Sequence, residues 1–462
     1  MQRRVAAISF PYEKDFFTQY KYLSQHKSYH FILESGNGGR YSMVGLDPIA
    51  ILRGKHDELR ITEGAKETVI KGNPIEEMKR YMKQYTAIYN DDYPPFQGGA
   101  VGYFSYDCIR YMETIPRTAT DDLQIPDLFF LLFDDVVVYD HRENLLWCIT
   151  HFTTDEEGAK LHVKEMMQTW MQDYPALHIS AAKSLATETT VSFTEDGFCD
   201  AVAVIKDYIA AGDVFQVNLS VRQSRPLHSH PLEIYTKLRE MNPSPYMGYL
   251  ELSDFQLVSG SPELLIRKRG KEVSTRPIAG TRSRGKDANE DEALAKELIE
   301  NEKERAEHVM LVDLERNDLG RVCKYGTVCV DELMTIEKYS HVMHIVSNVR
   351  GELEEDKNAF DVIKAVFPGG TITGAPKIRT MEIIEQLEPI RRGAYTGSIG
   401  WIDYSGDMEL NIVIRTLLAK DGQAYVQAGA GIVIDSNPKH EYQESLKKAT
   451  ALWRSKESSE DW

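Results

Sequence analysis

The sequence contains few cysteines and no closely spaced pair of them. Its 462 residues include five cysteines, Cys108, Cys148, Cys199, Cys323 and Cys329. The number is odd, and no two of them have the Cys-x-x-Cys spacing. A disulfide framework or a zinc site is therefore not expected, and such cysteine usage is typical of a reducing cytoplasm. We accordingly predict a cytoplasmic protein.

The chain also lacks long apolar stretches and an excess of positive charge. No apolar run approaches the roughly 18 residues that a membrane helix needs, and the N-terminal segment has no apolar stretch typical of a signal peptide. The net charge of −17 disfavours nucleic acid and anionic membranes as partners. The phosphate-binding and dinucleotide-binding glycine patterns are missing as well. An anionic substrate would therefore need local cations.

Composition along the chain divides it into parts. Short apolar and aromatic runs separated by turns dominate the first part, Ala, Ser and Thr dominate a short second part, and strands alternate with helices in the third. We predict an N-terminal region at residues 1–175, a linker at 176–192, a catalytic region at 193–455 and a frayed acidic tail at 456–462.

Helical periodicity is clearest at residues 156–172, 289–310, 359–366, 376–387 and 439–455. Thr194 suits the N-cap of a further helix that Gly212 ends. Strand patterns occupy residues 99–104, 128–133, 136–139, 214–222, 255–260, 263–269, 396–403, 410–418 and 424–427.

Two distant pairs of glutamates share the same spacing. Glu304 and Glu307 form the first pair, and Glu441 and Glu444 form the second. Residues three apart lie on one face of a helix, although such a pair alone is usually a solvated surface feature. Four carboxylates directed at one point would repel each other unless a cation lay between them, and Mg²⁺ prefers oxygen ligands. The pattern therefore predicts a Mg²⁺ site that grips an anionic substrate.

Glycine-rich segments and two cations accompany these pairs. Gly429, Ala430 and Gly431 would let backbone N–H groups approach a ligand closely, although such a segment is as often a tight turn. Arg415 ends an apolar run, so its charge needs a partner, either a substrate carboxylate or a carboxylate of the protein. Lys448 lies four residues after Glu444, on the same helical face.

Several of these segments together resemble the chorismate-utilising enzymes. The likeness is carried, in the order of that family, by Pro277–Arg282, Glu307–Asp318, Gly374–Lys377, Gln427–Gly431 and the final Glu-x-x-Glu, with Leu33–Ser35 and Gly39–Ser42 near the N-terminus. The resemblance implies an α+β fold in which two antiparallel β-sheets form a sandwich flanked by helices.

The resemblance also implies roles for individual residues. Glu307 and Glu444 would bind Mg²⁺ with support from Glu304 and Glu441, and the metal would hold the ring carboxylate of chorismate. Glu263 would protonate the leaving hydroxyl as a general acid, and His344 would lie beside the ring. The implied substrate-binding residues are Gly280, Thr281, Tyr395, Arg415, Gly429, Ala430, Gly431 and Lys448.

The resemblance implies the nucleophile through the residue at position 216. Family members that add water have a lysine base where this chain has Gln216. Glutamine cannot take a proton from water, which favours ammonia and opposes a water-adding isochorismate or salicylate synthase. The chain shows no glutaminase signature, so a separate glutamine amidotransferase subunit is implied as the ammonia source.

Two amino products remain open. The chain is most similar to family members that form 4-amino-4-deoxychorismate for para-aminobenzoate and folate synthesis, ahead of those that form anthranilate for tryptophan synthesis. Some of the former carry an attacking lysine in the Pro-Ile-x-Gly-Thr motif, where this chain has Ala279, so we expect direct attack by ammonia. A catalytically inactive regulatory homologue is a further alternative.

Ser35, Pro245, Tyr246 and Met247 match the residues of a tryptophan pocket in the anthranilate-forming members. In this chain they would hold tryptophan, form a vestigial pocket or simply pack.

Overall fold

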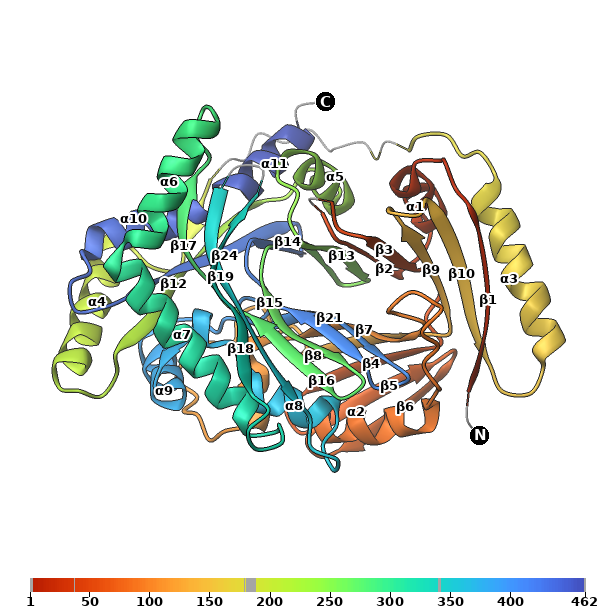
Figure 1. Cartoon of the computed structure of the whole chain (residues 1–462), viewed down its shortest axis with the longest axis horizontal. Coiled ribbons are helices and arrows are strands. Elements are labelled where there is room, and N and C mark those ends of the chain that lie inside the picture. The colour runs from red at the N-terminus through yellow and green to blue at the C-terminus, as the bar shows by residue number, and fades with distance from the viewer. Residues whose placement is uncertain (1–2, 37, 178, 180–187, 340–341, 461–462) are drawn as a thin grey trace.

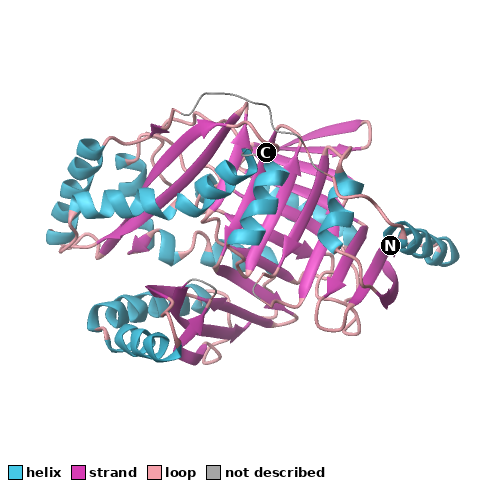
Figure 2. Cartoon of the chain, turned by 90° about the horizontal axis from the view of Figure 1, so that it is seen from above, coloured by secondary structure: helices cyan, strands magenta, loops and turns pink. Residues whose placement is uncertain are grey.

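The computed structural model describes residues 3–36, 38–177, 179, 188–339 and 342–460. Helices surround two large sheets that lie face to face (Figures 1 and 2). Of the helices in these residues, none has the length and apolar character needed to cross a membrane.

Each sheet has twelve strands within the described residues, and every pairing is antiparallel. The first sheet runs in the order β1 (Arg4–Pro11), β10 (Leu145–Phe152), β9 (Asp135–Asp140), β3 (Tyr41–Gly45), β2 (Tyr29–Glu34), β13 (Tyr246–Leu252), β14 (Phe255–Ser261), β23 (Thr416–Lys420), β24 (Gln423–Ile432), β12 (Gln216–Pro226) and β11 (Thr190–Val191), with β20 (Gly374–Ala375) beside β12.

The second sheet runs in the order β17 (Ile278–Ser283), β19 (Val342–Glu352), β16 (Glu272–Arg276), β15 (Leu264–Arg269), β22 (Met408–Asn411), β21 (Ser398–Asp403), β7 (Gly99–Phe104), β8 (Leu128–Phe133), β4 (Ala50–Lys55), β5 (Glu58–Glu63) and β6 (Lys66–Lys71), with β18 (Cys329–Lys338) beside β19. Two antiparallel sheets with flanking helices confirm the predicted fold class.

Both sheets combine strands from the two ends of the chain. Strand β2 pairs with β13, and β7 pairs with β21, so each predicted region contributes to each sheet. The division at residues 175 and 193 stays a prediction from sequence. Most of the predicted linker lies outside the described residues, although Thr190 and Val191 pair with β12.

Apolar side chains fill the space between the sheets and cover their outer faces. Strand β8 is apolar throughout because both of its faces are buried. Phe129, Leu131 and Phe133 point between the sheets, where they join Phe31 and Trp401. Their neighbours along the strand point to the opposite face, as the two-residue period of a strand requires.

Helices cover the outer faces of both sheets. The first sheet carries α1 (Phe16–Ser24), α3 (Glu156–Met171), α5 (Pro231–Met241) and α11 (Thr450–Glu460). A second group of helices packs against a hydrophobic cluster that includes strands of both sheets. These helices are α2 (Pro74–Met82), α4 (Glu195–Ala210), α7 (Glu302–Gly320), α8 (Ala359–Val366), α9 (Lys377–Leu387) and α10 (Pro438–Lys448). Helix α6 (Ala288–Glu300) packs on β17 and β19. Short 3₁₀ turns are η1 (Lys83–Tyr85), η2 (Tyr106–Tyr111) and η3 (Gly370–Ile372).

Two predicted helices are each divided in the structure. The pattern at 289–310 breaks at Asn301, which has an extended backbone and ends α6 while its side chain accepts a hydrogen bond from the Glu304 N–H at the start of α7. The pattern at 439–455 divides after Lys448. The predicted fraying is wrong for residues 456–460, because α11 continues to Glu460, whose carboxylate accepts hydrogen bonds from the buried Lys456.

The strand predicted at 410–418 is two strands in different sheets. Strand β22 ends at Asn411 in the second sheet, and β23 begins at Thr416 in the first. The chain crosses between the sheets over residues 412–415, and Arg415 has a φ of 48° at the end of that crossing. A backbone that leaves one sheet for the other cannot keep the hydrogen-bond pattern of either, which is why the strand is interrupted.

Candidate active site

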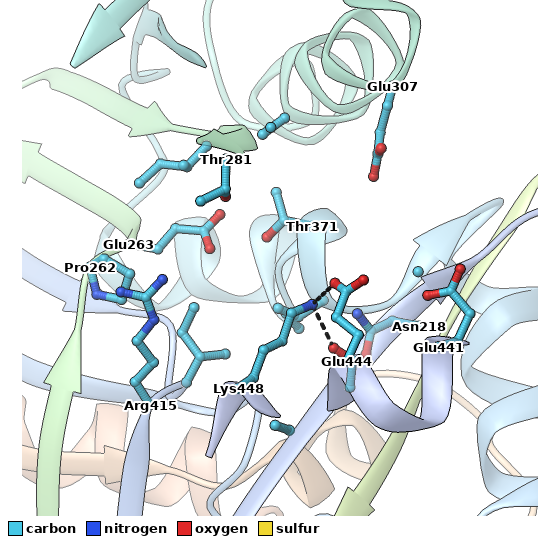
Figure 3. Close-up of a pocket in the computed structure, with 18 of the residues that line it drawn as sticks. Asn218, Pro262, Glu263, Thr281, Glu307, Thr371, Arg415, Glu441, Glu444 and Lys448 are labelled. Atoms are coloured by element: carbon cyan, nitrogen blue, oxygen red, sulfur yellow. Dashed lines mark hydrogen bonds and ion pairs between the residues drawn. The ribbon is translucent and has the colours of Figure 1, made fainter. Parts of the chain in front are cut away.

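A cavity of about 810 Å³ lies between α7 and α10, beside the ends of strands from both sheets. Figure 3 shows the carboxylates of Glu307, Glu441 and Glu444 on one side of it and Glu263, Thr281 and Arg415 on the other. The lining residues used below are Gln216, Asn218, Glu263, Ala279, Gly280, Thr281, Glu304, Glu307, His344, Thr371, Tyr395, Arg415, Gln427, Gly429, Gly431, His440, Glu441, Glu444 and Lys448.

Two crossings between the sheets place Glu263 and Arg415. Glu263 lies between the end of β14 in the first sheet and the start of β15 in the second, and Arg415 ends the other crossing. The crossings are tied together: Gly260 N–H donates to the Arg415 carbonyl at 3.0 Å, and Ile412 N–H donates to the Glu263 carbonyl at 3.0 Å. Both side chains are therefore held by backbone hydrogen bonds on rigid elements.

The Glu263 carboxyl is buried with one oxygen free. The residue is 5% exposed, and its Oε1 has no hydrogen-bond partner within the described residues. Burial raises the pKa of Glu263 to about 7, while Thr371, the Ile278 backbone and Arg415 act in the opposite direction. A carboxyl with a pKa near neutral pH is suited to donating a proton to a leaving group.

Arg415 is a half-buried cation without an ion-pair partner in the described part of the chain. Burial lowers its pKa, and Glu263 and Tyr339 partly oppose that effect. Of the two partners that the sequence left open for this arginine, a protein carboxylate within ion-pair distance is not found among the described residues. Figure 3 shows its guanidinium directed into the cavity beside Glu263, so a ligand carboxylate is the remaining candidate.

The two glutamate pairs converge on the same cavity, as their spacing predicts. Helix α7 contributes Glu304 and Glu307, and α10 contributes Glu441 and Glu444. Burial raises the pKa of Glu307, which a hydrogen bond from Gln216 Nε2 to its Oε1 at 3.2 Å partly offsets. Four carboxylates facing one space favour a cation, and carboxylate oxygens are the ligands that Mg²⁺ prefers, so the donor set fits that metal.

His440 adds a donor that the sequence did not single out. One ligand atom each from His440, Glu441 and Glu444 lies within 4.8 Å of the others. Opposite them, Arg282 forms an ion pair with Glu304 at 3.2 Å. Helix α10 therefore holds three possible ligand atoms close together at this side of the cavity.

Lys448 braces the carboxylate beside it. Its Nζ lies 3.0 Å from Glu444 Oε1 and donates to the Gly429 carbonyl at 3.0 Å. Both contacts are drawn in Figure 3. The spacing of four residues on α10 brings the pair together, and the contact links the end of that helix to β24.

His344 lines the cavity and has one ring nitrogen without a partner among the described residues. Its Nδ1 lies 3.0 Å from the Gly280 carbonyl and 3.1 Å from Thr281 Oγ1, while its buried Nε2 has no partner within the described residues. Since a carbonyl only accepts hydrogen bonds, Nδ1 carries the proton and Nε2 is an acceptor. Burial lowers the pKa of His344, which favours this neutral form. Gly280 has a φ of 60°, and a Cβ there would approach Leu298 and Glu304.

The glycines of β24 make room for amides of the neighbouring strand. In the antiparallel register Asn218 faces Gly431, and Ser220 faces Gly429. A Cβ on Gly431 would collide with Gln216 Nε2, and one on Gly429 would lie 2.6 Å from Asn218 Oδ1. Gly429–Gly431 is thus part of a strand and not a turn, and the absent side chains accommodate these two amides.

The cavity collects the predicted catalytic, metal and substrate residues with one exception. Ala430 does not line it, because alternate residues of a strand face opposite sides and its methyl group packs in the core. Thr371, His440, Asn218 and Gln427 were assigned no role from sequence. The strand period could have revealed Asn218, which follows Gln216 by two residues, whereas Thr371 carries no such signal.

A second cavity, of about 150 Å³, gathers the four residues matched to a tryptophan pocket. Ser35, Pro245, Tyr246 and Met247 line it together with Leu33, Glu34, Tyr41, Met43, Pro95, Arg267, Ile399, Gly400, Trp401, Glu409 and Asn411. The residues therefore lie together as predicted. Tryptophan as a ligand stays a prediction from the resemblance.

A comparison with protein families decides the identity of the fold. The family model described as chorismate binding enzyme matches residues 28–454. The chain belongs to this family of chorismate binding enzymes.

Individual family members agree with that assignment. This chorismate binding enzyme is 58% identical to aminodeoxychorismate synthase component 1 of Bacillus subtilis over 100% of its own length and 98% of that protein. It is 44% identical to anthranilate synthase component 1 of Acetivibrio thermocellus over 93% of its length and 90% of that protein. The solved structure of anthranilate synthase component I from Streptococcus pneumoniae matches with a TM-score of 0.80 and 34% identity, covering 91% and 93% of the two chains.

Proposed function

We propose that the chain converts chorismate and ammonia into 4-amino-4-deoxychorismate, the reaction of an aminodeoxychorismate synthase component 1. The observation that carries the proposal is one cavity that holds three features: a buried Glu263 whose raised pKa suits an acid, an Arg415 without an ion-pair partner among the described residues, and two pairs of carboxylates. The 58% identity to the Bacillus subtilis protein supports this product over anthranilate.

The two ends of the cavity suit the two carboxylates of chorismate. Arg415 can bind one of them through its paired N–H donors. The other would lie against the acidic side, which would repel it without a cation. Glu304, Glu307, Glu441 and Glu444 would hold Mg²⁺ there, and the bound metal would neutralise the carboxylate and fix its position.

Glu263 acts on the leaving hydroxyl. Hydroxide leaves poorly, so the carboxyl donates its proton to the hydroxyl oxygen as the carbon–oxygen bond breaks, and water departs. The carbon–nitrogen bond forms with ammonia, which afterwards loses one proton. General acid catalysis of this kind is typically worth about 10²–10⁴-fold in rate. His344, whose Nε2 is a hydrogen-bond acceptor, lines the same cavity.

Ammonia is the nucleophile in this proposal. Gln216 lines the cavity where a base would be required to activate water, and an amide cannot serve as that base. Ala279 also lines the cavity and offers no amine for a covalent intermediate. Ammonia would be supplied by a separate glutamine amidotransferase subunit, and ammonium salts at high pH should replace that subunit.

One assay tests the proposal. The purified chain is incubated with chorismate, Mg²⁺ and ammonium, and the products are separated and identified by mass. We expect an amino product that yields para-aminobenzoate only after a separate lyase is added, without a covalent protein adduct. Fluorescent anthranilate with an equal amount of pyruvate would show the alternative reaction. No turnover, even with an amidotransferase subunit, would favour an inactive homologue.

A further inference from the structure

Two lysines that no step of the proposed reaction uses line the cavity from its two helices. Lys303 lies on α7 beside Glu304, and Lys447 lies on α10 three residues after Glu444. Both residues line the cavity and are exposed to solvent, which places them at its opening. Neither ammonium group has an ion-pair or hydrogen-bond partner among the described residues. We call Lys303 and Lys447 the rim lysines.

The other cations of the cavity are already engaged in the proposed site. Four of the described lysine and arginine residues line the cavity. Of these, Lys448 pairs with Glu444 at 3.0 Å, and Arg415 lies deeper, beside Glu263 (Figure 3). The two charges at the opening are therefore the ones that still need an explanation.

Helix stability does not explain both rim lysines. Lys447 lies in the last turn of α10, where the helix dipole favours a cation. Lys303 lies in the first turn of α7, two residues after the Asn301 cap, where the same dipole disfavours a cation. Because Lys303 has no ion pair in the described residues to offset that cost, a role in the cavity explains it better than a role in the helix.

The charge of Lys303 acts within the cavity. Burial raises the pKa of Glu307, and the charges of Lys303 and Lys448 are among the influences that act in the opposite direction. Coulomb energy falls only with the inverse of distance, and salt at about 0.1 M screens it over a length of about 10 Å. A charge that acts on the Glu307 carboxylate therefore also acts on an anion that enters the cavity.

The rest of the protein opposes the entry of an anion. The chain has a net charge of −17, and two pairs of glutamates line the cavity itself. Chorismate carries two ionised carboxylates, so it would be repelled on its approach to the protein. Cations gathered at the opening of a cavity raise the local concentration of an anionic ligand there.

We propose that Lys303 and Lys447 form a cationic rim that draws dianionic chorismate into the cavity. This inference rests on the proposed function in taking chorismate as the ligand. It adds a step before the chemistry, in which the lysines act by attraction over a distance and do not touch the reacting atoms. The same charges repel Mg²⁺, so the rim has opposite effects on the two ligands.

The test is the Kd for chorismate, measured by calorimetry with saturating Mg²⁺ and without ammonium. Lys303→Gln and Lys447→Gln remove a charge and keep most of the side chain. We expect each variant to raise this Kd about two- to fivefold at an ionic strength of about 0.1 M, and less than about 1.5-fold at about 1 M, where the screening length is about 3 Å. With ammonium added, kcat should change less than about twofold.

The Kd for Mg²⁺, measured without chorismate, separates attraction from damage to the site. In both variants it should fall, because a charge that repels the metal has been removed. A structural disturbance of the acidic helices would weaken the binding of both ligands. A weaker affinity for Mg²⁺ together with a weaker affinity for chorismate would therefore overturn the rim.

Arg305→Gln and Lys439→Gln are the matched controls. Arg305 lies on α7 and Lys439 on α10, both are exposed, and neither is among the described residues that line the cavity. These variants should keep both Kd values within about 1.5-fold at about 0.1 M.

Three further outcomes would overturn the rim. They are a wild-type Kd for chorismate in the variant that combines Lys303→Gln with Lys447→Gln, a rise in that Kd that persists at the higher ionic strength, and an equal rise in the controls. A wild-type protein that binds chorismate but forms no amino product would instead overturn the proposed function, because the binding measurement does not depend on turnover.

Discussion

At the scale of single residues, the site combines groups whose charges are costly without a ligand. Glu263 is buried and holds its proton to about pH 7, Arg415 is half-buried without a carboxylate partner among the described residues, and Glu307 is a half-buried carboxylate near Glu304. Perturbed ionisable groups gathered in one cavity are typical of an active site. Predictions at this scale concern the glutamates.

Glu444→Gln should nearly abolish turnover. The change keeps the shape of the side chain but removes one of the negative charges that would hold Mg²⁺, and it leaves Lys448 without its carboxylate partner. We expect the concentration of Mg²⁺ that gives half-maximal rate to rise at least about tenfold, as loss of a metal ligand typically costs more than a second-sphere change. Steady-state rates over a Mg²⁺ titration measure this effect.

Glu457→Gln is the matched control for that experiment. Glu457 lies on α11 and pairs with Arg225 at 2.8 Å, away from the cavity lining. This variant should keep the Mg²⁺ dependence of the wild type. Wild-type behaviour of Glu444→Gln would remove Glu444 from the metal site.

The general acid predicts a pH dependence. Because burial raises the pKa of Glu263 to about 7, the protonated form that donates to the leaving group declines as pH rises through that value. At a constant concentration of free ammonia, kcat should therefore fall above about pH 7. Glu263→Gln should lose about 10²–10⁴-fold in kcat and lack this limb. Initial rates measured from below to above pH 7 test both statements. If the rate of the variant still fell above that pH, the fall would belong to a group other than Glu263.

The raised pKa of Glu263 also predicts that replacing this residue stabilises the folded protein at high pH. In the unfolded chain Glu263 ionises near its ordinary value of 4.5, whereas the folded protein keeps it protonated to about 7. The folded state thus binds more protons between these values, so the stability contributed by this group falls as pH rises through that window. Glu263→Gln should be more stable than the wild type at pH 8, by roughly 1–3 kcal/mol. Urea unfolding of both proteins at pH 5 and pH 8 measures the difference in their free energies of unfolding. An equal difference at the two pH values would contradict the raised pKa of Glu263.

At the scale of secondary-structure elements, the site depends on where helices and strands stop. Asn301 ends α6 and begins α7, which sets the direction in which Glu304 and Glu307 point. The crossings at Glu263 and at residues 412–415 end strands in one sheet and begin strands in the other. Each interruption brings a residue of the proposed site to the cavity.

Asn301→Ala tests the role of the helix junction. The change removes the side chain that accepts from the Glu304 N–H, which typically costs about 1 kcal/mol. Because the first turn of α7 carries Glu304 and the next turn carries Glu307, we expect the half-saturating Mg²⁺ concentration to rise as well. Urea unfolding and a Mg²⁺ titration of the rate measure the two effects.

Asp155→Ala is a control that removes a helix cap far from the glutamates. Asp155 caps α3 by accepting from Gly158 N–H, on the outside of the first sheet. Its loss should lower the free energy of unfolding by a similar amount while leaving the Mg²⁺ dependence unchanged. An equal rise in the Mg²⁺ requirement for both variants would mean that Asn301 does not act through the glutamates.

At the scale of the whole molecule, the residues that we propose for catalysis all lie after residue 193, but the strands of the two sheets do not. Strand β13 pairs with β2 on one side, and β21 pairs with β7, so removal of the first half would expose an edge in each sheet. The space between the sheets is likewise filled by Phe31, Phe129 and Phe133 from the first half.

A fragment of residues 193–462 should therefore fail to fold on its own. Two unpaired edges and an open apolar face favour aggregation. We expect the fragment to be insoluble or to lack a cooperative thermal transition, whereas the full chain unfolds cooperatively. A soluble fragment that turns over chorismate would show that the second half forms an independent domain.

The sequence by itself determined the classes of element and the chemistry. Uniform apolar runs such as β8 predict strands buried on both faces, and the i, i+3 glutamates predict paired carboxylates because helical spacing is a local property. Of the catalytic, metal and substrate residues implied by the family resemblance, all but Ala430 line the cavity. Ala430 was misplaced because a motif does not show which face of a strand a residue occupies.

Only the tertiary structure showed which residues far apart in the sequence lie together. Periodicity cannot show that residues 289–310 break at Asn301, since a capping side chain competes with a helical pattern at a single position. Nor can it show that the apolar run before Arg415 crosses from one sheet to the other, or that the amides of β12 lie over the glycines of β24. Those facts follow from strand pairing between distant segments, whose register depends on packing of the whole core and not on any local stretch of sequence.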